Sequence, residues 1–172
     1  KVLVIGAGNM GLTYAEGMYK SKLLKKRNIM VLDKSYKKLE ELYQISHFDA
    51  FKELEDCVPK ADIIFISVKP HHAEELFKNM RPMVKSDQIL ISIMAGVTLE
   101  AIKKFSGVKK VIRAMPNLPA KVGLGITSYV ASPEVSQIEL LTAESLLNTT
   151  GKSIRVSNEN LIDASTGISG SG

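Results

Sequence analysis

Three glycines near the amino terminus have a spacing that is typical of phosphate binding. Gly6, Gly8 and Gly11 come directly after the apolar run Val2–Ile5 and before a stretch with a helical pattern. Where a strand meets a helix in this way, the first glycine permits a tight turn and the second lets the backbone approach a pyrophosphate. The third lets the helix pack closely against the strand, and the helix amino terminus offers free N–H groups. We therefore expect this segment to bind the pyrophosphate of a dinucleotide.

An acidic residue follows at the distance at which such sites recognise a ribose. Asp33 lies 22 residues after Gly11, close to the spacing of about 20 at which a carboxylate binds the adenosine ribose hydroxyls. This spacing favours NAD(H), because Asp33 would repel a phosphate on that ribose. The side chains that come next could nevertheless cradle such a phosphate, and they are Lys34, Ser35, Lys37 and Lys38. NADH and NADPH both stay open as cofactors, and the same residues would also serve as a plain helix start.

Two later segments supply further candidate contacts, because ligands bind open α/β sheets at the carboxyl ends of strands. Lys69 follows an apolar run that ends at Val68, and it is a candidate cofactor contact. Alternatively, Pro70 merely opens the next helix and Lys69 points to water. Further along, the small residues Ala95 and Gly96 would let a flat nicotinamide ring approach the backbone.

The residue pattern assigns no catalytic group and no metal site. Asn117 stands between Pro116 and Pro119 on a stiffened loop, which suits the edge of a site. Hydride transfer needs no catalytic triad or carboxylate pair, because the cofactor supplies the hydride and the protein positions it. His71 and His72 are interpreted as exposed surface residues, because no other ligands stand at a suitable spacing. Cys57 is interpreted as a buried filler.

The net charge of +5 is not interpreted as a nucleic-acid footprint. Basic residues gather where the first helix should end, where they suit the negative end of the helix dipole, and the other lysines are scattered among acids. That group comprises Lys20, Lys22, Lys25, Lys26 and Arg27. No apolar run approaches the roughly 18 to 20 residues that span a bilayer. We expect no nucleic acid or membrane partner, and a cytoplasmic location.

Short runs rich in Val and Ile alternate with stretches of helical period. This alternation predicts an α/β fold of the Rossmann type, with a doubly wound, mainly parallel sheet and helices on both faces. The predicted strands are 2–5, 29–32, 63–68, 89–93, 110–113, 126–131 and 153–156. Two of them, 63–68 and 89–93, are apolar at nearly every position and are predicted to be innermost.

Apolar residues at helical spacing place helices between these strands. One stripe on a helix that begins at Pro70 comprises Ala73, Leu76, Phe77 and Met80, and the same spacing recurs at Tyr36, Leu39 and Tyr43. Ser132, followed by Pro133 and Glu134, is interpreted as a helix cap, which predicts a helix over 134–147.

The length of 172 residues suits one main domain. We expect a dinucleotide-binding domain over residues 1–156 and, over 157–172, the start of a connection to a further domain. The chain starts without methionine and ends within a glycine-serine turn, so we expect it to be part of a longer protein.

Five segments, taken in order, resemble the pyrroline-5-carboxylate reductases. They are IGAGNMG at 5–11, VKP at 68–70, SIMAGV at 92–97, VIRAMPNLP at 111–119 and LIDASTGISGSG at 161–172. Many dehydrogenases share the first segment, but the last two are much more restricted. The resemblance therefore covers nearly the whole chain.

The resemblance implies reduction of 1-pyrroline-5-carboxylate to L-proline, with a hydride from NADH or NADPH. It also implies that the glycine-serine motif leads into a helical carboxyl-terminal domain that dimerises and completes the substrate pocket. On this basis the chain would be the cofactor-binding part of a homodimer or larger assembly that acts on a cyclic imino acid. Alone it would be incomplete for catalysis.

The family's cofactor contacts fall on matching positions of this sequence. The resemblance implies contacts to the pyrophosphate from Gly8, Asn9 and Met10, and contacts along the nicotinamide ribose from Val68, Lys69 and Pro70. It places Ala95 and Gly96 beside the nicotinamide, and Asn117 near the ring. Asp33 departs from the family pattern, in which many members carry Asn or Ser with an Arg nearby, and it puts the usual preference for NADPH in doubt.

Two other functions stay open from the residues alone. Because the glycine motif is shared, another NAD(P)-dependent oxidoreductase acting on an imine or a hydroxy acid is one alternative. A dinucleotide-sensing regulatory module is the other.

Overall fold

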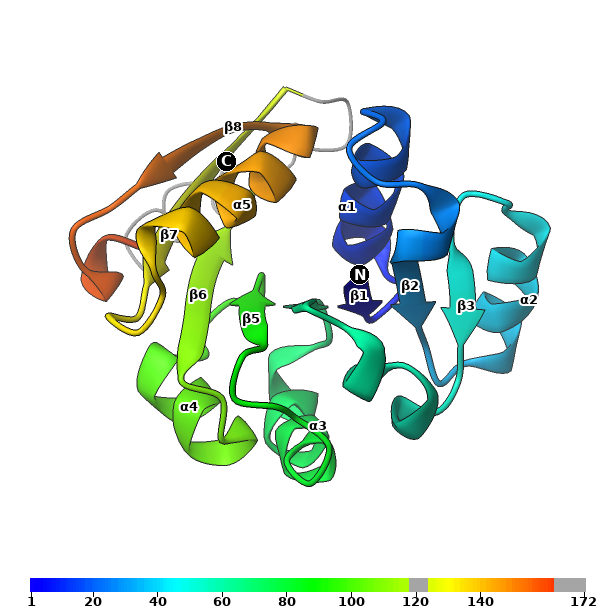
Figure 1. Cartoon of the computed structure of the whole chain (residues 1–172), viewed down its shortest axis with the longest axis horizontal. Coiled ribbons are helices and arrows are strands. Elements are labelled where there is room, and N and C mark those ends of the chain that lie inside the picture. The colour runs from blue at the N-terminus through cyan, green and yellow to red at the C-terminus, as the bar shows by residue number, and fades with distance from the viewer. Residues whose placement is uncertain (118–123, 163–172) are drawn as a thin grey trace.

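The computed structural model describes residues 1–117 and 124–162, which form a twisted sheet with helices on both faces (Figure 1). Within the described residues the strand order is β3-β2-β1-β4-β5-β6-β7-β8. The strands are β1 (Val2–Ile5), β2 (Ile29–Leu32), β3 (Asp49–Phe51), β4 (Ile63–Ile66), β5 (Ile89–Ser92), β6 (Lys110–Met115), β7 (Gly125–Ala131) and β8 (Gly151–Arg155). The α-helices are α1 (Asn9–Lys20), α2 (Tyr36–Gln44), α3 (Ala73–Met80), α4 (Leu99–Ser106) and α5 (Gln137–Leu147). Short 3₁₀ turns occupy Lys26–Asn28, Leu54–Asp56, Val58–Lys60, Pro70–His72 and Asn148–Thr150.

The sheet is parallel from β3 through β6, and only the β6–β7 pair runs antiparallel among the described strands. The predicted doubly wound, mainly parallel class is therefore confirmed. β4 and β5 lie in the middle of the order, and all their residues are buried. The prediction that these two strands are innermost is also confirmed, and their apolar runs follow from being covered on both faces.

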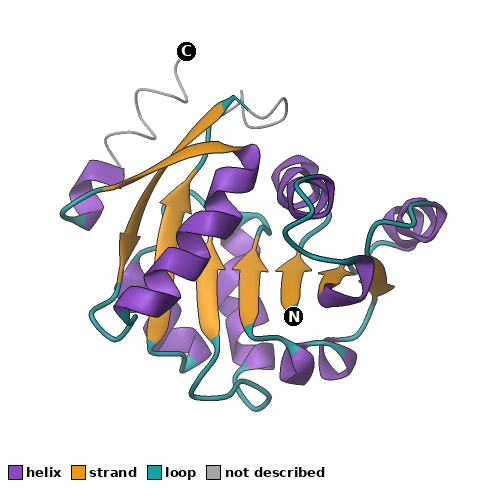
Figure 2. Ribbon diagram, turned by 45° about the horizontal axis from the view of Figure 1, so that its top comes forward, coloured by secondary structure: helices purple, strands orange, loops and turns teal. Residues whose placement is uncertain are grey.

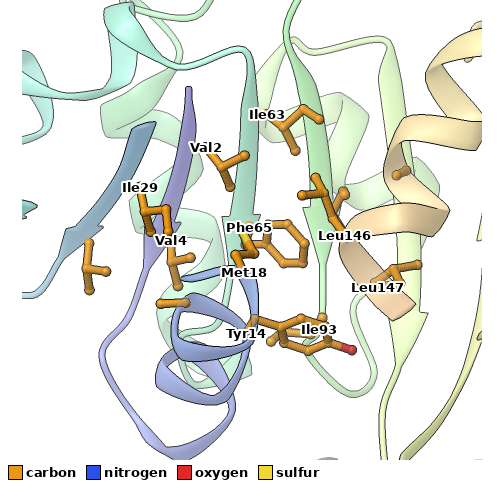
Figure 3. Packing of buried hydrophobic residues seen from close by; sticks show 14 of the residues in the cluster. Val2, Val4, Tyr14, Met18, Ile29, Ile63, Phe65, Ile93, Leu146 and Leu147 are labelled. Carbon is orange, nitrogen blue, oxygen red and sulfur yellow. The ribbon is translucent and has the colours of Figure 1, made fainter. Parts of the chain in front are cut away.

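Alternate strand residues point to two separate cores. On one face α1, α2 and α5 pack against residues such as Val4 and Phe65, and on the other α3 and α4 pack against residues such as Leu3 and Ile64 (Figure 2). Figure 3 shows the first of these cores, where the Tyr14 and Phe65 rings lie with their centroids 5.2 Å apart. This two-sided burial makes the strands rigid, so their carboxyl ends form a fixed platform for a site.

Several helix predictions hold. The stripe after Pro70 is buried at every predicted position, although the first turn of that segment is a 3₁₀ turn and α3 starts at Ala73. α1 ends at Lys20, where the basic group begins.

The prediction that Cys57 is buried is also confirmed, and burial raises the pKa of its thiol to about 12. No helix of the described chain is long and apolar enough to cross a membrane.

Two helix predictions are wrong. α5 begins at Gln137 instead of Glu134, because Ser136 and Glu139 form a capping box. Ser132 does not cap it: its hydroxyl accepts from the Val111 N–H and donates to the Lys109 carbonyl. On α2 the buried side chains are Leu39 and Leu42, whereas Tyr36 and Tyr43 are exposed.

The predicted strand boundaries lie close to the observed ones, but one strand was missed. β3 was not predicted because it has three residues, none of which is fully buried, so it carries no recognisable periodicity. β4 ends at Ile66 and β5 at Ser92, each a little before its predicted end, whereas β6 extends to Met115.

Candidate dinucleotide-binding site

A cavity of about 930 Å³ opens where β1, β2, β3 and β4 end. Part of its wall comes from the glycine turn, at Ile5, Gly6 and Gly8, and another part comes from α3 and the turn before it, at His72, Glu75 and Asn79. β1 and β4 are neighbours in the sheet, although the chain passes through β2 and β3 between them. This is the topological switch point at which open α/β sheets bind ligands.

The three glycines of the motif have three different surroundings. Gly6 has φ +102°, and a Cβ there would lie 2.4 Å from the Ser67 carbonyl oxygen. A Cβ on Gly11 would lie 2.0 Å from the Gly6 carbonyl oxygen, so only glycine lets α1 approach the turn. A Cβ on Gly8 would meet nothing within 4 Å. Space is therefore left open at Gly8 on the cavity wall, where a pyrophosphate would fit.

The amino terminus of α1 lies beside that space. Gly8 is the N-cap residue, and it has no side chain to satisfy the N–H groups of the first turn. The first four N–H groups of a helix have no intrahelical acceptor, and with the helix dipole they favour an anion. Asn9, Met10 and Gly11 belong to this turn, although they do not line the cavity.

Asp33 is positioned by the turn that it faces. Its carboxylate accepts hydrogen bonds from the Ala7 N–H and the Ser35 N–H, each at 2.8 Å. A carboxylate has about four lone-pair sites, so these two bonds leave capacity for ribose hydroxyls. Ser35 caps α2 by accepting from the Lys38 N–H at 3.4 Å. The helix-start and ribose-binding interpretations are thus compatible, and Asp33, Lys34 and Ser35 all line the cavity.

The segment after β3 forms a wall that sequence reasoning missed. It comprises Lys52, Glu53, Leu54 and Glu55. The Lys52 Nζ donates to the Tyr36 hydroxyl at 2.6 Å, and this bond raises the pKa of Lys52. The signal that could have found this wall is the short strand β3, since its pairing with β2 brings its end to the same sheet edge.

The remaining predicted residues divide into two groups. Val68 and Lys69 line the cavity beside Ser67, whereas the cavity wall does not include Pro70, Ala95, Gly96 or Asn117. Gly96 has φ +73°, with open space where a Cβ would be. The Asn117 side-chain oxygen accepts from the Ile126 N–H at 3.0 Å, which ties the end of β6 to the start of β7. The cavity thus brings together residues of the glycine turn, the β2 end and the β4 end, but not Ala95, Gly96 and Asn117, which were predicted to lie beside the nicotinamide ring.

A partly buried ion pair joins β6 to the segment after β8. The Arg113 guanidinium, which is fully buried on β6, donates to Glu159 Oε1 at 2.8 Å. The same carboxylate oxygen accepts from the Leu99 N–H at the start of α4. This pair holds the segment after β8 against the sheet.

Other predicted features carry no chemistry in the described part of the chain. His71 and His72 are exposed, as predicted, and His72 also borders the cavity. No group of three His, Cys, Asp or Glu residues suitable for a metal occurs among the described residues. Leu118 and Pro119 of the fourth motif, and the last motif from residue 163 onward, lie outside the described residues.

The chain is similar to known oxidoreductases in its sequence. A family model described as NADP oxidoreductase coenzyme F420-dependent matches residues 1–96. Pyrroline-5-carboxylate reductase 2 of Bacillus subtilis is 34% identical over 174 residues, which cover all of this chain and 62% of that protein.

Solved structures give the same result. A pyrroline-5-carboxylate reductase from Coxiella burnetii aligns with a TM-score of 0.93 and 28% identity over 99% of this chain and 64% of that one. A Plasmodium falciparum pyrroline carboxylate reductase with NADP bound aligns with a TM-score of 0.87 and 27% identity, over 99% of this chain and 62% of that one. The chain thus spans a little under two thirds of the length of these relatives. It belongs to the family of NADP oxidoreductases described as coenzyme F420-dependent, and its resemblance to the pyrroline-5-carboxylate reductases extends over its whole length.

Proposed function

We propose that this chain is the cofactor-binding part of an enzyme that reduces 1-pyrroline-5-carboxylate to L-proline with NADH or NADPH. The observation that carries the cofactor assignment is the open space at Gly8, on the cavity wall and at the amino terminus of α1. The substrate assignment rests on the likeness to pyrroline-5-carboxylate reductases along the whole chain.

The chain's residues would act by binding and orienting the cofactor, which when bound supplies the hydride. The pyrophosphate would lie against the turn formed by Gly6, Gly8, Asn9, Met10 and Gly11. Asp33, with Lys34 and Ser35, would bind the adenosine ribose, and the nicotinamide ribose would follow Val68, Lys69 and Pro70. Ala95 and Gly96 would flank the nicotinamide, and Asn117 would lie near the ring. We assign no catalytic acid or base to this chain.

The remaining proposals concern the whole protein. We infer that residues 1–156 form the dinucleotide-binding domain and that 157–172 begin the connection to a helical domain that completes the substrate pocket. A homodimer or larger assembly through that domain, and a cytoplasmic location, belong to the same proposal. The further domain is supported by the share of the relatives' length that lies outside the match with this chain.

Turnover by the full-length protein tests the proposed function. With at least one of the two cofactors, proline should form from the cyclic imine. One proline should form for each reduced cofactor that is consumed. Absence of proline with both cofactors would overturn the assignment. Activity on other cyclic imines or on hydroxy acids alone would move the protein to a different oxidoreductase.

A further inference from the structure

How the cavity would distinguish NADH from NADPH, given the proposed function, follows from the register of two neighbouring strands. Leu32 of β2 pairs with Phe51 of β3, and the Asp33 N–H donates to the Phe51 carbonyl at 3.2 Å. The ladder therefore brings Lys52, the next residue after Phe51, beside Asp33 at the carboxyl edge, where paired strands lie about 4.8 Å apart. Lys52 and Asp33 both line the cavity.

The Lys52 ammonium contacts an aromatic side chain. Its Nζ donates to the Tyr36 hydroxyl at 2.6 Å and lies 4.1 Å from the centroid of the Tyr36 ring. Tyr36 is the first residue of α2, directly after the N-cap Ser35, and it is 71% exposed, so this contact is not core packing. The ammonium thus lies beside the first residue of α2, at the end of the cavity where Asp33 lies.

The two cofactors differ only at the 2′ position of the adenosine ribose. A hydroxyl there donates to a carboxylate, whereas a phosphate carries a charge of about −1.5 to −2 and needs cations or N–H donors. Asp33 cannot leave the site without losing its bonds to the Ala7 and Ser35 N–H groups. Its negative charge, together with Glu53 and Glu55 on the same wall, therefore opposes a phosphate unless a nearby cation offsets it.

Of the lysines that the sequence offered for this phosphate, only one brings its positive charge to the cavity. Lys34 lines the cavity, but the cavity wall includes neither Lys37 nor Lys38. Lys38 instead lies 3.6 Å from the Glu41 carboxylate on its own helix.

We propose that Lys52 is the specificity-determining residue that admits a 2′-phosphate, while Asp33 binds the 2′-hydroxyl, so that the site accepts both NADPH and NADH. The two side chains act on opposite cofactors from adjacent positions on β2 and β3. Losing Lys52 weakens NADPH binding selectively, and losing Asp33 weakens NADH binding more than NADPH binding.

Dissociation constants for both reduced cofactors, measured by fluorescence titration on the full-length protein, test this proposal. A charge-assisted hydrogen bond contributes enough that Lys52→Met should raise the dissociation constant of NADPH about tenfold or more. The dissociation constant of NADH should stay near that of the wild type. Lys52→Arg, which keeps the charge and the contact with the Tyr36 ring, should restore NADPH binding. Asp33→Ala should weaken NADH more than NADPH.

Lys60→Met is the matched control. Lys60 also follows β3 in sequence and lies near an aromatic ring, with its Nζ 5.8 Å from the Phe51 centroid, but the cavity wall does not include it. It should leave both affinities unchanged. Equal losses of NADH and NADPH in Lys52→Met, no loss of either, or the same change in Lys60→Met would overturn the proposal.

The binding and turnover experiments can contradict the two proposals independently. Selective loss of NADPH in a protein that forms no proline would support the role of Lys52 and overturn the proposed reaction. Proline formation with an unchanged NADPH to NADH ratio in Lys52→Met would do the reverse. A wild-type protein that binds neither dinucleotide would overturn both.

Discussion

At the scale of single residues, one sequence motif contains three separate physical requirements. Gly6 needs a positive φ and lies close to Ser67, Gly11 lets α1 touch the turn, and Gly8 leaves space unfilled. The sequence pattern predicted all three positions, because the spacing itself encodes the strand–turn–helix geometry. It also predicted that Asp33 follows the second strand at the spacing of a ribose contact. It did not predict the hydrogen bond from Ala7 to Asp33, because that contact depends on how β1 and β2 pair.

Alanine substitutions should separate the glycine that serves binding from the one that serves folding. In Gly8→Ala the weaker N-cap and the lower entropy of the unfolded chain nearly cancel, so the unfolding temperature should change little. Dinucleotide binding should fall at least tenfold, because the new methyl group enters the pyrophosphate space. In Gly11→Ala the backbone clash should cost about 3 kcal/mol or more of stability. Thermal unfolding and cofactor titration of both variants measure this, and wild-type affinity in Gly8→Ala would contradict the proposed path of the pyrophosphate.

At the scale of elements, the sequence predicted what was long and periodic. The stripe of α3 and the apolar runs of β4 and β5 were recognisable because burial imposes a period or a continuous run. The start of α5 was misplaced because two serines compete for the cap. Ser136 wins through the reciprocal bonds with Glu139, while Ser132 is engaged by the β6 backbone. β3 was too short to recognise, and with it the sequence analysis missed the cavity wall that begins at Lys52.

The start of α5 should be sensitive to acid through Glu139. The Lys110 ammonium, 2.9 Å from the Glu139 carboxylate, lowers the pKa of Glu139 below its ordinary value of 4.5, with help from the Ser136 N–H. A carboxyl group with a lowered folded-state pKa stabilises the protein above its unfolded pKa, and this contribution is lost as the pH falls through the folded value. Glu139→Gln preserves the capping box, because glutamine also serves at that position. It should therefore cost only the charge interaction, about 0.5 kcal/mol at neutral pH for a partly exposed pair.

Unfolding curves of wild type and Glu139→Gln across the acid range measure this effect. The difference in stability should be present at neutral pH and should vanish in acid below the folded pKa of Glu139. In a Lys110→Met background the same substitution should have a smaller effect. A difference that persisted unchanged into strong acid would show that the charge of Glu139 is not its source.

At the scale of the whole molecule, the sheet order decides where the site is. The chain runs outward from β1 to β2 and β3, returns to β4 beside β1, and continues outward in the other direction through β5 and β6. The crevice between these two halves is where the predicted residues of the glycine turn, the β2 end and the β4 end come together. Alternating elements predicted this class, but not the antiparallel β7, since strand direction depends on tertiary pairing. Ala95, Gly96 and Asn117, which were predicted to lie beside the nicotinamide ring, follow β5 and β6 and are not part of the cavity wall.

Cys57 lies behind the part of the cavity wall that follows β3. Its thiol is buried and contacts the backbone carbonyls of Glu53 and Leu54, two residues of the cavity wall. Because burial raises the thiol pKa to about 12, the native protein should react with alkylating reagents only during moments when this wall opens. A dinucleotide that requires the closed wall should slow labelling by the factor 1 + [L]/Kd.

Mass spectrometry of samples quenched at successive times would follow this labelling. Denatured protein should react at once, native protein slowly, and protein with bound cofactor more slowly still. Rapid labelling of the native protein, or a rate that ignores the cofactor, would contradict the placement of the thiol behind the wall. The half-time of alkylation at Cys57 would then report how readily the wall after β3 opens, with no need for substrate or turnover.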